Sequence, residues 1–283
     1  MPGLPAGTLF LVATPIGNLE DITLRAVRVL REVDLVAAED TRHTSRLLHH
    51  LGIRAETTSL HEHNEEARAS ALVARLQAGA RIALVSDAGT PGISDPGFRL
   101  VRAAIEAGCR VEAIPGPSSI LAALITSGLP TDAFTFLGFP PARGSARSEW
   151  FARLRAERRT SVFFEAPHRV RQTLGEVIET CGDRQAAIGR ELTKLHEEVR
   201  RGLLSTLLAE LPARPIGEFT LVLAGAPDAP SDVPEATDTQ IFAEFCRMTE
   251  DGRSRREAIT ALARRFGLRS REVYAAVERA RHS

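Results

Sequence analysis

Short apolar runs alternate with amphipathic stretches along the first half of the chain. The clearest run, RIALVSD over residues 81–87, is apolar, contains β-branched residues and leads into a turn, as a buried strand does. Such runs predict strands over residues 8–14, 33–40, 57–64, 81–87 and 110–116. The intervening stretches predict helices over residues 22–31, 43–51, 97–108 and 117–127, and one that ends near residue 78. This alternation predicts a mostly parallel sheet with helices on both faces.

The alternation is interrupted at residues 131–147, where prolines and a glycine follow the strand-like FTFLGF. We therefore predict a domain boundary near residue 130 and an exposed basic loop at about residues 140–147. Farther along, apolar runs predict strands over residues 160–166, 185–192, 196–202 and 219–225, with a helix over residues 167–180. The later runs are closely spaced, which favours a more antiparallel, mixed sheet.

The last part of the chain is predicted to be a linker followed by a small helical tail. Residues 226–238 are rich in proline, alanine and aspartate, as linkers are. Ser254 and Glu257 then have the spacing of a capping box, and Gly267 is predicted to end the helix that follows. Two short helices with arginines on the outside resemble a helix-turn-helix unit. A helical hairpin that only packs against the rest of the protein is the alternative.

The composition is that of an ordinary globular chain. Its 283 residues are 43% hydrophobic and 25% charged, and this length predicts roughly two domains. No apolar run approaches the roughly 18 residues that span a bilayer, and the start, MPGLPAGT, lacks the features of a secretory signal. The three cysteines lie far apart and form no CxxC pair. These features favour a cytoplasmic protein with no membrane partner.

Arginine is concentrated in two stretches of a chain whose net charge is zero. Residues 143–159 contain six arginines and two glutamates, and residues 252–271 contain seven arginines and one glutamate. Two basic patches in a neutral protein favour an anionic partner, such as nucleic acid, that binds at defined places. A solvated helix face in each stretch is the alternative, and the sequence does not decide between them.

Four polar loops marked by glycine or proline follow strands of the predicted parallel sheet. They are TPIGNLED (14–21), AEDTRHT (38–44), SDAGTPGISDPG (86–97) and IPGPSS (114–119). Ligands of open α/β sheets bind beyond the carboxyl ends of the strands, where these loops are expected to meet. An ordinary turn is the alternative for any one of them, but four such loops at one edge predict a cleft.

The loop SDAGTPGISDPG resembles a phosphate cradle in its glycines but not in its charges. A phosphate site combines free amide groups with a cation, whereas Asp87 and Asp95 would repel a phosphate. Carboxylates suit hydroxyl groups, such as those of a ribose, or a positive centre, and glycines let the backbone approach an adenine edge. These features favour an adenosine-like ligand, of which S-adenosylmethionine is one candidate. No dinucleotide or Walker nucleotide motif is present.

The segment HEHN places His61 and His63 two residues apart, on one face if the segment is a strand. A metal would need a third ligand, which Asp40 or His43 could supply. We expect a polar substrate contact here rather than a metal.

Eight motifs, in this order along the chain, carry a family resemblance. They are ATPIGNLEDIT (13–23), AEDTRHTSRLL (38–48), SLHEHNE (59–65), VSDAGTPGISDPG (85–97), IPGPSSI (114–120), GFPPARG (138–144), FFEAPHR (163–169) and RELTKLHEE (190–198). Together they closely resemble the small-subunit ribosomal RNA methyltransferase I family, which belongs to the class III methyltransferases of the tetrapyrrole methylase fold. The resemblance covers about residues 8–225, and the helical tail fits it too.

The resemblance implies two α/β domains of tetrapyrrole methylase type, over residues 1–130 and 131–226. It also implies a small helix-turn-helix-like RNA-contact region over residues 237–283. S-adenosylmethionine is expected in the cleft between the two α/β domains. The implied protein is a homodimer that methylates the ribose 2′-hydroxyl of a decoding-centre cytidine in 16S ribosomal RNA of the small subunit.

The resemblance also assigns cofactor contacts to ten residues of this chain. They are Asp87, Ala88, Gly89, Thr90, Ile93, Ser118, Ser119, Phe164, Ala166 and Leu192. Tetrapyrrole enzymes carry Gly-Asp-Pro where this chain has Gly89-Thr90-Pro91, so the acidic contact is expected to move to Asp87. The first loop keeps only Gly17 and Asp21 of the G-x-G-x-G-D pattern of those enzymes, which favours an RNA substrate over a tetrapyrrole.

A ribose hydroxyl is a poor nucleophile at neutral pH, so a positioned proton acceptor would assist its methylation. Asp40 and Glu39, at the end of a predicted strand, are candidates for this base, and Glu165 from the second domain is a rival. Capping of the helix that follows is the alternative role of Asp40 and Glu39.

Six further residues are candidate contacts to the RNA, either through a phosphate or through the nucleotide. They are Arg42, His43, His61, Asn64, Arg143 and Arg147. A satisfied local turn is the alternative role of His61 and Asn64.

The basic stretches contain few aromatic residues, namely Trp150, Phe151 and Phe266. This argues against a stacking platform for single strands and favours a structured, partly assembled ribosomal particle. Two other functions stay open, a tetrapyrrole methylase on the same fold and a non-catalytic RNA-binding protein of the small subunit.

Overall fold

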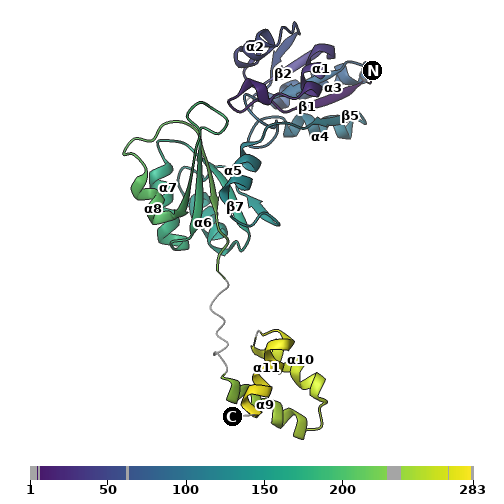
Figure 1. Cartoon of the computed structure of the whole chain (residues 1–283). Helices are drawn as coiled ribbons and strands as arrows, with labels where there is room; N and C mark the ends of the chain where they lie inside the picture. The colour runs from purple at the N-terminus through teal and green to yellow at the C-terminus, as the bar shows by residue number, and fades with distance from the viewer. Residues whose placement is uncertain (1–4, 6, 62–63, 228–236, 267, 282–283) are drawn as a thin grey trace. The chain divides into compact units, whose positions relative to one another are not determined.

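The computed structural model of the chain describes residues 5, 7–61, 64–227, 237–266 and 268–281 (Figure 1). The chain divides into two compact units, residues 1–225 and 226–283. The first unit contains two five-stranded sheets, and the second unit is helical.

The first sheet is parallel throughout, and its strand order is β3-β2-β4-β1-β5. Its strands are β1 (Thr8–Val12), β2 (Leu35–Ala38), β3 (Thr57–Ser59), β4 (Ile82–Val85) and β5 (Arg110–Ile114). The helices between them are α1 (Leu24–Glu32), α2 (Thr41–His50), α3 (Glu65–Gln77) and α4 (Phe98–Glu106), and a short 3-10 helix, η1 (Leu19–Asp21), precedes α1. The predicted parallel sheet is confirmed.

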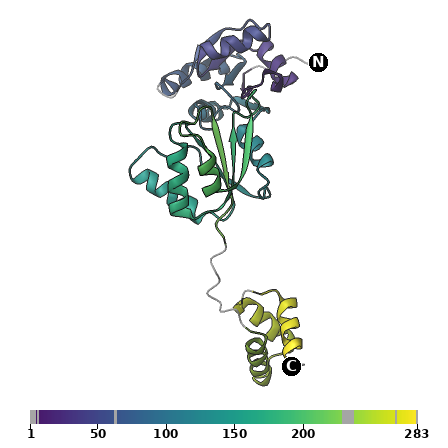
Figure 2. The ribbon, with the colours of Figure 1, turned by 60° about the vertical axis from the view of Figure 1, so that its left-hand side comes forward.

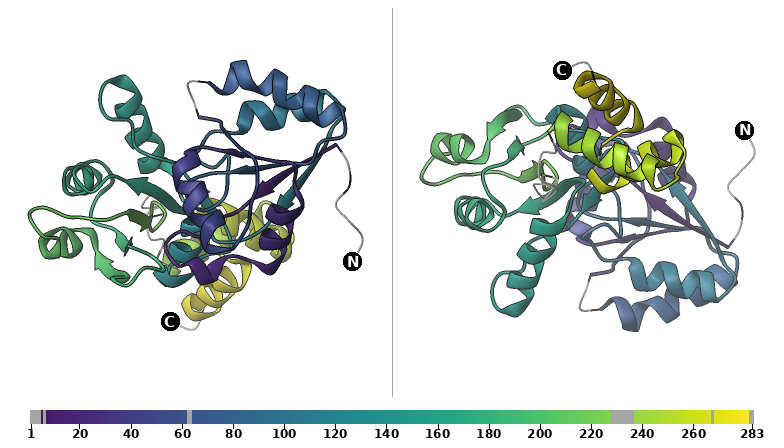
Figure 3. Two further views of the ribbon diagram at one scale, coloured as in Figure 1. Left: turned by 90° about the horizontal axis from the view of Figure 1, so that it is seen from above. Right: turned by 90° about the horizontal axis from the view of Figure 1, so that it is seen from below.

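Successive side chains of each strand go to opposite faces of this sheet, so each face has its own apolar core. Phe10 and Val36 pack with residues of α1 and α2, whereas Leu9 and Leu35 pack with residues of α3 and α4. Figure 3 shows α3 and α4 side by side on one face. Helices therefore cover both faces, as the sequence pattern predicted.

The second sheet is mixed, with strand order β6-β7-β10-β8-β9. Its strands are β6 (Phe134–Phe136), β7 (Thr160–Glu165), β8 (Gln185–Arg190), β9 (Glu198–Leu203) and β10 (Phe219–Leu223). Only the β6–β7 pair is parallel, and the other three pairs are antiparallel. The predicted mixed, more antiparallel sheet is confirmed.

Helices also cover both faces of the second sheet (Figures 1 and 2). One face packs against α6 (Ser145–Ala156), α7 (Val170–Cys181) and α8 (Leu204–Glu210), around buried residues such as Trp150 and Leu174. The other face packs against α5 (Ser119–Ser127), whose Ala123 and Leu124 contact Val162 and Val222 of the sheet. Helix α5 lies before the boundary predicted near residue 130, yet its apolar face belongs to the core of the second sheet.

Two helices of this unit, α6 and α8, were not predicted. Helix α6 begins at Ser145, directly after Gly144, whose φ of 79° is left-handed backbone. It therefore starts within the segment that was expected to be an exposed loop. Its buried face consists of Arg147, Trp150, Phe151 and Leu154, at helical spacing. The arginines around this apolar face obscured it in the sequence.

In the second unit, the described residues form three helices, α9 (Asp238–Glu250), α10 (Arg255–Phe266) and α11 (Ser270–Arg281). Their own core includes Ile241, Leu262 and Val273. The predicted capping box is confirmed, since the Glu257 amide donates to Ser254 Oγ at 3.3 Å and the Ser254 amide donates to Glu257 Oε2 at 2.9 Å. Helix α9 was not predicted. Gly267 and most of the predicted linker lie outside the described residues.

Candidate active site

A cavity of about 600 Å³ opens at the carboxyl edge of the first sheet, a volume typical of small-molecule sites. All four of the predicted cleft loops contribute to it. From the first sheet and α5, it is lined by Ile16, Glu39, Asp87, Ala88, Gly89, Thr90, Ile93, Ser94, Asp95, Ser118, Ser119, Ile120 and Leu121. From the second sheet, it is lined by Phe134, Phe136, Phe139, Phe164, Glu165, Ala166, Pro167, Leu192, Glu218, Phe219 and Thr220. The predicted cleft is confirmed, and both sheets form its walls.

The loop of residues 86–97 is fixed at both of its ends. Near its start, Gly89 and Thr14 exchange two backbone hydrogen bonds of 2.9 and 3.0 Å, and Gly89 has a φ of 79°. At its end, the buried Glu65 carboxylate accepts hydrogen bonds from the amides of Gly97, Arg99 and Leu100, at 2.8 to 3.2 Å. A carboxylate at the first turn of α4 thus supplies the cap that Gly97 lacks. These contacts hold both ends of the loop in place.

The loop of residues 14–21 contacts the RELTK segment of the second sheet. A Cβ atom at Gly17 would overlap the side chain of Lys194, so only glycine allows this approach. In that segment, Glu191 and Thr193 have left-handed φ values of 50° and 65°. Glu191 Oε1 accepts hydrogen bonds from Lys194 Nζ at 3.0 Å and from the Glu218 amide at 2.9 Å. These contacts place Leu192 in the cavity wall.

Three of the five acidic residues that line the cavity, Glu39, Asp87 and Asp95, come from loops of the first sheet. Burial raises the pKa of Glu39, and the nearby charges of Asp87 and Asp40 add to the effect. Burial also raises the pKa of Asp95, to about 6, with contributions from the charges of Glu39 and Asp87. Acidic groups held this close together favour a ligand that carries positive charge or donates hydrogen bonds.

Asp40 lies beside this cluster but does not line the cavity. It is the N-cap of α2, where its Oδ1 accepts a hydrogen bond of 2.8 Å from the Arg42 amide. The Arg42 backbone and side-chain hydrogen bonds lower the pKa of Asp40. Arg42 itself is 88% exposed, and His43 is exposed too. The helix-capping alternative therefore describes the contacts of Asp40. Glu39 lines the cavity, where its Oε2 accepts a hydrogen bond of 3.4 Å from the Asp87 amide.

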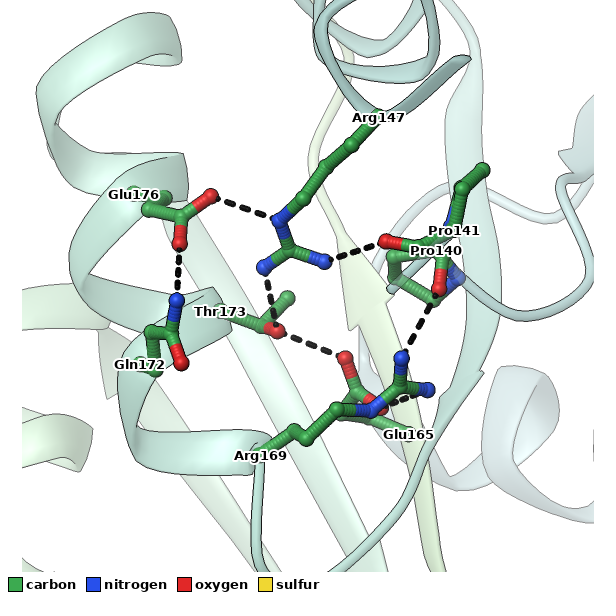
Figure 4. Close-up of polar contacts among 8 residues, drawn as sticks. All are labelled: Pro140, Pro141, Arg147, Glu165, Arg169, Gln172, Thr173 and Glu176. Carbon is green, nitrogen blue, oxygen red and sulfur yellow. Dashed lines mark hydrogen bonds and ion pairs between the residues drawn. The ribbon is translucent and has the colours of Figure 1, made fainter. Parts of the chain in front are cut away.

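Glu165 contributes to the cavity wall, but its side chain is 0% exposed. Its carboxylate accepts hydrogen bonds from the Ala166 amide at 2.7 Å and the Thr173 hydroxyl at 2.6 Å. It also forms an ion pair of 2.7 Å with Arg169 (Figure 4). These three contacts give the Glu165 carboxylate a structural role in the cavity wall.

Arg147, expected at the RNA surface, is instead buried at the start of α6 (Figure 4). Its guanidinium donates to Glu176 at 2.9 Å, to the Pro141 carbonyl at 2.8 Å and to the Thr173 hydroxyl at 3.0 Å. It also lies over the Phe151 ring, 5.0 Å from its centroid. These contacts correct the expectation of a phosphate contact at Arg147. Arg143, four residues earlier, is exposed as expected.

His61 and Asn64 do not line the cavity. Asn64 Oδ1 accepts a hydrogen bond of 2.9 Å from the His61 amide, and Asn64 Nδ2 lies 3.0 Å from His61 Nε2. The local-turn alternative describes these contacts. His63, the other histidine of the segment, lies outside the described residues, and no group of three or more metal-ligating side chains occurs among the described ones.

All ten residues expected to contact the cofactor line the cavity, from Asp87 in the first sheet to Leu192 in the second. Three phenylalanines, at positions 134, 136 and 139, also line it and were not predicted. Their signal was the strand-like FTFLGF, because residues 134 and 136 of a strand share one face.

The comparisons with known proteins agree with this fold. The family model described as Tetrapyrrole (Corrin/Porphyrin) Methylases matches residues 8–208. A solved uroporphyrin-III-C-methyltransferase from Thermus thermophilus matches with a TM-score of 0.56 and 24% identity, over 77% of this chain and 94% of that one. A solved diphthine synthase matches with a TM-score of 0.60 and 18% identity, over 77% and 90%. At these identities the two structures show a shared fold alone.

Curated relatives define the family more narrowly. A protein of Synechocystis sp. named Ribosomal RNA small subunit methyltransferase I is 47% identical over 270 residues, 95% of this chain and 96% of the relative. A protein of the same name from Mesorhizobium japonicum is 51% identical over 243 residues, 85% and 82% of the two chains. The chain therefore belongs to the tetrapyrrole methylase family and, within it, to the ribosomal RNA small subunit methyltransferase I group. Among the described residues, no helix has the length and apolar character needed to cross a membrane.

Proposed function

We propose that this chain methylates the ribose 2′-hydroxyl of a decoding-centre cytidine in 16S ribosomal RNA, in the cytoplasm, with S-adenosylmethionine as the donor. The observation that carries the proposal is the cavity, which combines an acidic cluster with apolar walls and contains all ten residues expected to bind the donor. The printed names of the relatives support an RNA of the small subunit as the substrate.

The residues present fit S-adenosylmethionine. Bound there, it would supply an electrophilic methyl group. Asp87 and Asp95 carry the negative charge that suits an amino group, a sulfonium or ribose hydroxyls. The hydroxyls of Ser118 and Ser119 lie at the start of α5, where amides and a hydroxyl favour a carboxylate. The volume of about 600 Å³ leaves room for part of a substrate nucleotide as well.

We propose Glu39 as the group that accepts the proton of the ribose hydroxyl. It lines the cavity, and its raised pKa brings it closer to the neutral range in which a general base works best. Asp40 and Glu165 were the other candidates. Their carboxylates are engaged in a helix cap and a buried network, so we assign them structural roles.

The helical unit and exposed arginines are proposed to bind the RNA backbone. Arg143, Arg256 and Arg271 are exposed. Several other arginines of the tail form surface ion pairs, such as Arg255 with Glu278 and Arg265 with Glu244, and such pairs are weak enough to exchange for phosphate contacts. We also propose the homodimer that the family resemblance implies.

Methyl transfer from labelled S-adenosylmethionine to unmethylated small ribosomal subunits tests the proposal. After nuclease digestion, we expect the label in 2′-O-methylcytidine at one position of 16S RNA. Label in a tetrapyrrole but not in RNA would favour the small-molecule methylase. Binding of subunits without any transfer would favour a non-catalytic protein.

A further inference from the structure

An aromatic wall, formed by Phe134, Phe136, Phe139 and Phe164, lines the side of the cavity that the second sheet provides. The Phe164 ring lies 5.0 Å from that of Phe136 and 5.2 Å from that of Phe139, with interplanar angles of 66° and 54°. Two aromatic residues of the basic stretches, Trp150 and Phe151, are instead buried in the core of the second sheet. Phe98 and Tyr274 are exposed elsewhere, but the four phenylalanines of the wall lie together at the cavity.

Phe139 is the most exposed member of this wall, at 50%, compared with 37% for Phe134. Its ring contacts that of Phe164, and half of the residue's surface is still exposed. An exposed aromatic ring at a cavity is a surface on which a planar ligand can stack.

The backbone on both sides of Phe139 is held by hydrogen bonds. On one side, the Phe164 amide donates to the Gly138 carbonyl at 3.0 Å. On the other side, the carbonyls of Pro140 and Pro141 accept hydrogen bonds from Arg169 at 3.3 Å and Arg147 at 2.8 Å.

The two arginines belong to the buried network of Glu165 and Thr173, as Figure 4 shows. A ring on such a fixed loop loses little conformational entropy when a ligand binds. This network gives Glu165 and Arg147 structural roles. It also fixes the position of Phe139, because its arginines hold the loop that carries the ring.

The same loop carries a cation. Arg143 follows Pro141 by two residues and is exposed, before α6 begins at Ser145. An aromatic ring and a guanidinium on one short loop match the two parts of an unpaired nucleotide, its base and its phosphate. The acidic cluster on the opposite loops would repel the phosphate, so the orientation of the nucleotide is restricted.

We propose that Phe139 stacks on the base of the nucleotide that is methylated, with Arg143 at its phosphate. The inference rests on the proposed function, because it assumes that an RNA ribose enters the cavity. It adds a binding surface for an unstacked base to a site that otherwise serves the methyl donor.

The first test is the rate of methyl transfer to small ribosomal subunits by Phe139→Ala at saturating S-adenosylmethionine. We expect kcat/KM for the subunits to fall about 5- to 150-fold, the range for loss of one base–aromatic stack. Phe139→Trp should keep kcat/KM within about threefold of wild type, and the donor Kd should not change in either variant. Phe98→Ala removes a phenylalanine that is 68% exposed but lies outside the cavity wall, so it is the matched control.

An unchanged kcat/KM in Phe139→Ala would overturn the inference. So would an equal loss of affinity for S-adenosylmethionine, because Phe139 would then contact the donor. If wild type itself transfers no methyl group to subunit RNA, the proposed function fails, and a second measurement decides on Phe139.

Tryptophan fluorescence of Phe139→Trp provides this second measurement, because the chain's single natural tryptophan, Trp150, is buried. Stacking on a base quenches an indole, so addition of subunits should quench the new emission and leave that of wild type unchanged. Quenching by S-adenosylmethionine alone, or no quenching by subunits, would contradict stacking on the substrate base.

Discussion

The Thr173 hydroxyl donates a hydrogen bond of 2.6 Å to the Glu165 carboxylate and accepts one of 3.0 Å from Arg147. Thr173 therefore bridges the buried Glu165 carboxylate and the buried Arg147 guanidinium (Figure 4). This relationship gives both side chains a structural role, and of the two only Glu165 lines the cavity.

Replacement of Glu165 tests whether its role is structural. Glu165→Ala removes the carboxylate that pairs with the Arg169 guanidinium and accepts from Thr173, so we expect the free energy of unfolding to fall by about 3 kcal/mol. Urea unfolding of the full chain measures this change. If Glu165 were the catalytic base, Glu165→Gln would instead abolish turnover and leave the unfolding midpoint as in wild type.

Glu39 and Asp40 are neighbours in the sequence, but we expect their replacement to have opposite effects on kcat. Glu39→Gln removes the proposed proton acceptor, so kcat should fall about 10²- to 10⁴-fold with little change in the donor Kd. Asp40→Asn keeps an oxygen that can cap α2, so its kcat and stability should be close to those of wild type. Single-turnover methyl transfer compares the two variants directly. The reverse order of activities would assign the base to Asp40.

The raised pKa of Asp95 predicts how the free energy of unfolding changes with pH. Its pKa is raised from 3.8 to about 6, chiefly by burial. Between about pH 4 and pH 6 the folded protein binds more protons at Asp95 than the unfolded chain does, so the free energy of unfolding falls as the pH rises through this window.

Asp95→Asn removes this effect. At pH 7.5 the variant should have a Tm about 2–4 °C above wild type, equivalent to about 1 kcal/mol after allowance for partial exposure. At pH 4 the difference should disappear. Differential scanning calorimetry at both pH values measures it, and an equal Tm difference at the two values would show that Asp95 titrates normally.

The helical unit has its own core, so its removal should leave the first unit folded. We expect a chain that ends at residue 227 to bind S-adenosylmethionine as wild type does, and to bind small subunits more weakly. Each lost phosphate contact should reduce the slope of log Kd against log salt concentration by about 1. An unchanged RNA affinity and salt slope would assign the unit to a role other than RNA binding.

Much of the fold was predictable because apolar periodicity is local. The strands of the parallel sheet and the cleft at its carboxyl edge follow from apolar runs and from loops such as residues 86–97. Helix α6 was missed because arginines surround its buried face, and α5 was placed with the first sheet because sequence order does not show which core a helix joins.

The site was predictable only in part, for a related reason. A motif can identify Asp40, Glu39 and Glu165 as candidates, but it cannot show which carboxylate faces a cavity and which accepts hydrogen bonds elsewhere. Arg147 was misplaced because a basic residue in a basic stretch is usually exposed. Its burial depends on Glu176 and Thr173, about 30 residues away.

S-adenosylmethionine is proposed to bind in the cavity at the carboxyl edge of the first sheet. Ala88 lines this cavity and is exposed, so Ala88→Trp would fill part of it without disturbing a core. Ala209→Trp, on the exposed side of α8 and outside the cavity wall, is the matched control.

Isothermal titration of the full chain with S-adenosylmethionine is the most direct measurement. We predict one site per chain in wild type and Ala209→Trp, and a Kd at least about tenfold higher in Ala88→Trp, equivalent to about 1.4 kcal/mol of lost contact. An unchanged Kd in Ala88→Trp would show that the donor binds outside this cavity.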